Sequence, residues 1–76
     1  MTFFHNGNEI EIHNSWMGKE TIKYNGEIMS SKYSFMGEQH EFSVLENDVW
    51  TDYVVEIGFA NYGVGFNIYR NNEPLI

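Results

Sequence analysis

Short turn motifs constrain the fold of this 76-residue chain more than any other feature. Asn6-Gly7, Asn25-Gly26 and Asn71-Asn72 each stand between two segments in which apolar and polar residues alternate. Asn and Gly tolerate the positive φ angles that two-residue hairpin loops require. The three motifs therefore predict tight β-hairpin turns, and they indicate nothing about chemistry.

Alternation with a period of two continues along nearly the whole chain, and no segment has the period of an amphipathic helix. We therefore expect an all-β fold, a compact antiparallel β-sandwich or partly closed barrel of six to seven short strands, in a single domain of residues 1–76. The expected strands are Glu9–Asn14, Lys19–Tyr24, Glu27–Phe35, His40–Glu46, Val49–Ala60 and Val64–Arg70, and Thr2–His5 is a candidate short edge strand.

The Asn25-Gly26 loop fixes the expected register of its hairpin by counting outward from the turn. The expected pairs are Tyr24 with Glu27, Lys23 with Ile28, and Ile22 with Met29. One face then carries Ile22, Tyr24, Met29, Tyr33 and Phe35, and the other carries Lys19, Thr21, Lys23, Ser30, Lys32 and Ser34, with Ile28 as its apolar exception. A one-residue slip would move every apolar side chain to the solvent face, so this separation favours the register.

The later strands have a similar two-sided pattern. The expected core residues are Val49, Thr51, Tyr53, Val55, Ile57 and Phe59, together with Phe42, Val44, Val64, Phe66 and Ile68. A turn at Asn47-Asp48 would place Leu45 opposite Trp50 on the other face, and a turn at Asn61-Tyr62 would place Gly58 opposite Gly65.

Composition limits how such a chain is stabilised and what it binds. There is no cysteine, so the two Trp, five Tyr and six Phe must supply most of the buried area. Eleven carboxylates against four basic residues give a net charge of −7, which disfavours nucleic-acid binding. Without a long apolar run or a signal-peptide pattern, we expect a cytoplasmic chain with no membrane span.

Candidate catalytic and metal-binding groups are sparse. His5, His13 and His40 are 8 and 27 residues apart and form no closely spaced pair, so we expect no metal site. His40 is expected on the core side of its strand, with a hydrogen bond at the rim of the core. The serines lack the strained Gly-x-Ser-x-Gly context of a nucleophile. We therefore expect no enzyme activity, no catalytic residue and no cofactor.

Binding candidates are mainly aromatic. The candidate binding residues are Trp16, Leu45, Trp50, Val54 and Tyr62. Tryptophan outside a core face is typical of contact surfaces for protein or sugar. The alternative is that Trp16 and Trp50 close the ends of the core. A weaker anion-binding candidate is formed by Lys19, Lys23 and Lys32, although Glu9 and Glu11 on the preceding strand would pair with these lysines.

The order of residues between Trp16 and Val44 is more specific than composition. Gly18-Lys19 precedes a strand, Gly26 turns it, Gly37 ends the return strand, and Phe42-Ser43-Val44 follows. This order resembles a strand repeat of the Fas apoptotic inhibitory molecule family and is similar to small bacterial β-domains. The resemblance implies a non-enzymatic β-sandwich that functions in interaction. It brings no catalytic residues, and the chain is too short for two such units, so that family's role in cell death is not carried over.

These observations leave three classes of function open. The preferred one is a non-catalytic protein-interaction domain that binds a protein partner or itself, as a homodimer. The second is a carbohydrate- or peptide-binding module that uses Trp50 and Tyr62. The third is a small acidic inhibitor or nucleic-acid mimic that would bind a basic partner through its negative charge.

Overall fold

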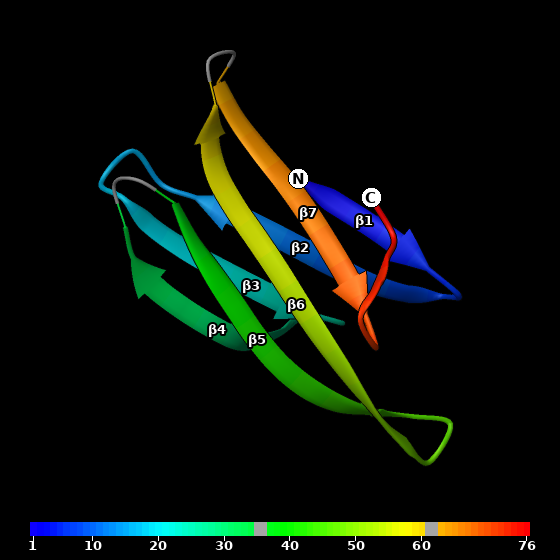
Figure 1. The fold of residues 1–76 in the computed structure, drawn as a ribbon. Coiled ribbons are helices and arrows are strands. Elements are labelled where there is room, and N and C mark those ends of the chain that lie inside the picture. The colour runs from blue at the N-terminus through cyan, green and yellow to red at the C-terminus, as the bar shows by residue number, and fades with distance from the viewer. Residues whose placement is uncertain (35–36, 61–62) are drawn as a thin grey trace. The chain divides into compact units, whose positions relative to one another are not determined.

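The computed structural model describes residues 1–34, 37–60 and 63–76, without the side chains of residues 59, 60, 63 and 64. These residues form eight strands in two four-stranded antiparallel sheets, with the orders β1-β2-β3-β4 and β5-β6-β7-β8 (Figure 1). The prediction of an all-β fold is confirmed. The two antiparallel sheets are consistent with the predicted β-sandwich. Within the described ranges, no helix has the length and apolarity needed to cross a membrane.

Each sheet lies in its own compact unit, Met1–Phe35 or Met36–Ile76. The first sheet contains β1 (Thr2–His5), β2 (Asn8–Asn14), β3 (Lys19–Tyr24) and β4 (Glu27–Tyr33). The second contains β5 (Gly37–Glu46), β6 (Val49–Ala60), β7 (Gly63–Arg70) and β8 (Glu73–Pro74). All seven predicted strands are present. The prediction of six to seven strands omitted β8, because two residues that include a proline carry no alternating pattern.

Two-residue turns join the strands of four hairpins. Both central residues have positive φ at Asn6-Gly7, Asn25-Gly26, Asn47-Asp48 and Asn71-Asn72. Positive φ at both positions is the requirement of a type I′ turn, whose twist matches that of the flanking strands. The three predicted turn motifs are confirmed. The predicted turn at Asn61-Tyr62 lies outside the described residues, although Gly58 pairs with Gly65 as expected.

Replacement of Gly26 by Val tests the conformational demand of one such turn. Gly26 has a φ of 84°, and a Cβ added there would meet no atom within 4 Å, so any cost comes from the backbone. A β-branched residue is strongly disfavoured at positive φ, and we expect urea denaturation to show a loss of about 2 kcal/mol. Gly26→Asn is the matched control and should cost less than about 1 kcal/mol. Equal losses of stability in the two variants would mean that the positive φ at residue 26 is not the cause of the loss.

The predicted register of the β3–β4 hairpin is wrong beyond its first two pairs. Tyr24 pairs with Glu27 and Lys23 with Ile28, but Ile22 pairs with Ser30 instead of Met29. The register shifts between Ile22 and Lys23, so β4 contains one extra residue, Met29, at a β-bulge. Alternation alone does not reveal such an insertion.

The bulge exchanges the two faces of β4 beyond Met29 relative to the prediction. Lys32 pairs with the buried Glu20, so it does not share a face with Lys19 and Lys23. Tyr33 pairs with Lys19 and is exposed, not part of the core as predicted. The predicted core residue Phe35 lies outside the described residues.

Each sheet has one buried face. In the first unit the buried side chains are Ile10, Ile12, Glu20, Ile22 and Tyr24, and in the second they are His40, Phe42, Thr51, Tyr53, Val55, Ile57 and Ile68. The later-strand core prediction is therefore confirmed for six residues, while Val44 and Phe66 are half-buried. Val49 is exposed, because it directly follows the Asn47-Asp48 turn at the end of its sheet. The side chains of Phe59 and Val64 lie outside the described part.

Candidate functional site

The solvent-facing side of β5, β6 and β7 gathers most of the predicted binding residues. Successive side chains of a strand point to opposite faces of the sheet. The residues that alternate with the buried ones on these strands therefore share the solvent-facing side. It consists of four cross-strand rows, Leu45–Trp50, Ser43–Asp52, Glu41–Val54–Tyr69 and Gln39–Glu56–Asn67. We call this surface the Trp50 face.

Trp50 and Leu45 form an exposed apolar pair on this face. They are direct cross-strand partners, as predicted, and are 67% and 57% exposed. The pair lies beside the Asn47-Asp48 turn, which fixes the geometry of the hairpin. Val54 is half-buried and lies two rows away on the same face. Three of the five predicted binding residues therefore share one surface.

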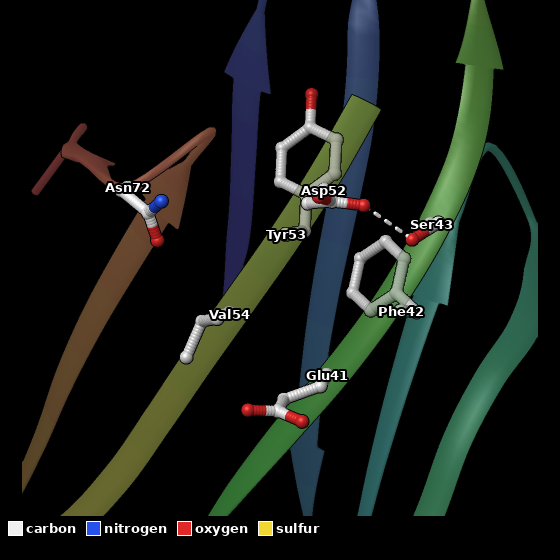
Figure 2. Close-up of a pocket in the computed structure, with 7 residues that line it drawn as sticks. All are labelled: Glu41, Phe42, Ser43, Asp52, Tyr53, Val54 and Asn72. Carbon is white, nitrogen blue, oxygen red and sulfur yellow. Dashed lines mark hydrogen bonds between the residues drawn. The ribbon is translucent and has the colours of Figure 1, made fainter. Parts of the chain in front are cut away.

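A polar depression of about 380 Å³ lies next to this apolar pair. It is lined by Glu41, Phe42, Ser43, Asp52, Tyr53, Val54 and Asn72, from β5, β6 and the Asn71-Asn72 turn (Figure 2). The Ser43 hydroxyl donates to Asp52 Oδ1 at 2.5 Å, and Gln39 Nε2 donates to Glu41 Oε1 at 2.8 Å. The depression is therefore acidic, and hydrogen bonds orient its carboxylates.

An ion-pair network ties the three strands together on the opposite, buried side. Arg70 donates from Nε and Nη2 to Glu46 Oε1, at 3.1 and 2.8 Å, and the Tyr53 hydroxyl donates to Glu46 Oε2. The Glu46 side chain is only 7% exposed and that of Arg70 is 30% exposed. Burial, and then the hydrogen bond to Glu46, raises the pKa of Tyr53 to about 12. The network holds the ends of β5 and β7 against β6, beneath the Trp50 face.

Sequence reasoning did not identify this network. The available signal in the sequence was Glu46, a charged residue on the same side of its strand as the core residues Phe42 and Val44. A carboxylate on a core face needs a partner, and Arg70 is the only basic residue after residue 36.

Trp16 is the predicted binding residue that belongs to the first unit. Trp16 lies in the β2–β3 connection of the first unit and is 92% exposed. The alternative in which both tryptophans close the core is therefore wrong. Tyr62 lies outside the described residues.

The predicted three-lysine strip is not assembled. Lys19 and Lys23 lie on the exposed face of the first sheet, while Lys32 lies on the other face. Lys23 pairs with Glu11, as the sequence predicted for this face. The pKa of Glu11 is lowered, mainly by a hydrogen bond with Glu9 and to a smaller extent by a hydrogen bond with His13. The hydrogen bond between Glu9 and Glu11 raises the pKa of Glu9. Lys23 thus lies opposite Glu11 and Lys32 opposite Glu20, while Lys19 Nζ lies over the Tyr33 ring, so the three lysines do not share one site.

The three histidines have different surroundings. His40 lies opposite Val55 on the core side of its strand, as predicted, and it is fully buried, so the expected rim position is wrong. His13 Nε2 lies 2.8 Å from Glu11 Oε2, and His5 Nε2 lies 3.2 Å from the Asn6 amide. Among the described residues, no group of three or more His, Cys, Asp or Glu side chains is arranged to hold a metal ion.

Comparison with known proteins identifies no relative of this chain. No family model, no curated protein and no solved structure matches the chain. The resemblance to the Fas apoptotic inhibitory molecule family therefore stays a hypothesis.

Proposed function

We propose that this chain is a non-catalytic protein-interaction domain and that the Trp50 face is its contact surface. The observation that carries the proposal is the adjacent pair of large apolar side chains, Trp50 and Leu45, both more than half exposed. Leaving such side chains in water forfeits about 1.5–3 kcal/mol each, which a partner that covers them would recover. Tryptophan is also among the residues that most often dominate the energy of protein interfaces.

The scaffold beneath the pair supports the same proposal. The type I′ turn fixes the hairpin, and the Glu46–Arg70 ion pair joins β5 to β7 on the buried side. A contact surface that is ordered before binding loses less conformational entropy when a partner docks. The Trp50 face is thus suited to a partner of defined shape.

Capture of a partner from lysate of the source cells tests this function. The bait is the full chain, compared with Trp50→Ala and with Trp16→Ala, which removes an even more exposed tryptophan from the first unit. We expect the Trp50→Ala bait to retain about tenfold less partner, and the Trp16→Ala bait to match the original, because hot-spot residues account for most interface energy. Equal capture by all three baits would exclude the Trp50 face. Turnover of any substrate by the purified chain would contradict a non-catalytic role.

A carbohydrate-binding module is the second candidate. It is favoured by the depression lined by Ser43, Asp52 and Glu41, since ligand sites combine a few oriented polar groups with an apolar surface. Fluorescence titration of the Trp16→Phe variant with soluble oligosaccharides, which reports on Trp50 alone, distinguishes this function from the first. Saturable binding that added salt leaves unchanged would favour the sugar, because no ionic contact is involved.

A further inference from the structure

Negative charge is concentrated in the unit that carries the Trp50 face. Seven of the eleven carboxylates and one of the four basic residues belong to Met36–Ile76. The carboxylates are Glu38, Glu41, Glu46, Asp48, Asp52, Glu56 and Glu73. The single basic residue, Arg70, is ion-paired with Glu46 on the buried side. The first unit, with four carboxylates and three lysines, is nearly balanced.

On the Trp50 face the charges alternate with apolar groups. Strand β6 presents Trp50, Asp52, Val54 and Glu56 in succession on this side. Every second residue of a strand is about 6.6–6.8 Å further along, so apolar and acidic positions alternate at that spacing. Glu41 lies beside Val54 on β5 and adds a third carboxylate. The described residues of this face include no lysine or arginine.

We propose that the Trp50 face binds an extended segment of a partner protein in which every second residue faces this surface and those residues are alternately basic (arginine or lysine) and apolar. This proposal rests on the proposed function and names the chemistry of the partner. Basic side chains would pair with Asp52 and Glu56, and a cation above the indole of Trp50 would gain a cation–π contact. Apolar side chains between them would cover Leu45 and Val54.

Electrostatics also disfavour a second copy of this chain as the occupant of this face. Two Trp50 faces would bring like charges together, which opposes association and is relieved only when the partner carries the opposite sign. Charge complementarity therefore selects a basic partner over a homodimer on this face. Self-association then becomes an outcome that the experiment must exclude.

Synthetic peptides test the proposal on the full chain with Trp16→Phe, so that fluorescence reports on Trp50. The probes are three capped heptapeptides, Val-Ser-Arg-Ser-Val-Ser-Arg, Val-Ser-Ser-Ser-Val-Ser-Ser and Val-Ser-Glu-Ser-Val-Ser-Glu, called the arginine, serine and glutamate peptides. In an extended chain each places valine and the varied residue alternately on one side. We expect the arginine peptide to bind about tenfold more tightly than the serine peptide at about 50 mM salt, and the glutamate peptide not to bind. The preference should shrink at about 500 mM salt, because exposed charges are then screened.

Matched charge variants separate this surface from the net charge of the chain. Asp52→Asn with Glu41→Gln removes two carboxylates from the Trp50 face, and Glu9→Gln with Glu11→Gln removes two from the first sheet. The first pair should weaken the arginine peptide about tenfold and leave the serine peptide unchanged, while the second pair should change either by less than about twofold. Near-ultraviolet circular dichroism confirms that each variant is folded.

Three results would overturn the proposal. Equal weakening by both double variants would mean that only net charge matters. Loss of arginine and serine peptides alike in Trp50→Ala, with no effect of either charge pair, would mean that the face binds without preferring a basic segment; the proposed function would stand. A dimer in sedimentation that Trp50→Ala abolishes would make a second copy the occupant.

Discussion

Replacement of Gly37 by Ala is expected to lower the free energy of unfolding by about 3 kcal/mol or more. Gly37 has a φ of 100°, where side chains are rarely accommodated. An added Cβ would overlap the Ile57 carbonyl oxygen and would lie 2.8 Å from the Gly58 Cα. Both contacts are with backbone of the paired strand β6, so no side chain can rotate away to relieve them.

Gly58 provides the matched control, because it is the cross-strand partner of Gly37. A Cβ added at Gly58 would meet no atom within 4 Å, and we expect Gly58→Ala to change the free energy of unfolding by less than about 1 kcal/mol. Urea denaturation of both variants makes the comparison. If Gly37→Ala were as mild as Gly58→Ala, the close approach of β5 to β6 at this pair would be incorrect.

Replacement of Glu46 by Ala is expected to cost about 3 kcal/mol, at the low end of the effect of breaking a buried ion pair, because Arg70 is partly exposed. The change leaves the Arg70 guanidinium and the Tyr53 hydroxyl without their shared acceptor. Glu38→Gln, at an exposed position of the same strand, is the control and should change stability by less than about 0.5 kcal/mol. Equal changes in the free energy of unfolding of the two variants would mean that the network does not stabilise the fold.

The pH dependence of unfolding checks the same network independently. The pKa of Tyr53 is about 12 in the folded chain and about 10 in an ordinary tyrosine. Between these values the folded chain holds a proton that the unfolded chain has lost, so stability falls as pH rises from about 10 to about 12. Tyr53→Phe should lose this part of the decline. An unchanged slope in that variant would assign the decline to other groups.

Much of the second sheet follows from its turns and alternation. Once Asn47-Asp48 is taken as a two-residue turn, the pairing of Leu45 with Trp50 follows by counting, and it places Trp50 opposite the core side of β6. The same count places Asp52 and Glu41 on the Trp50 face. Their grouping was nevertheless missed, because charges that look dispersed along the chain become neighbours only when strands are aligned.

Two features were beyond sequence patterns for physical reasons. The bulge at Met29 adds a residue to β4, and the alternation on each side of it is compatible with the regular pairing as well. The contact between Glu46 and Arg70 joins residues 24 positions apart through an intervening strand. Alternation indicates which face each side chain occupies, but it does not indicate which distant charge completes a buried pair.

Within each sheet every strand pairs with the next one in sequence, and this has a consequence for how the chain folds. Contacts between sequence neighbours close short loops, which cost less chain entropy than the long crossovers of Greek-key sheets. Chains with low contact order reach the native state quickly. We therefore expect each sheet to grow from its type I′ turns outward, so that a defect in one hairpin leaves the first contacts of the others able to form.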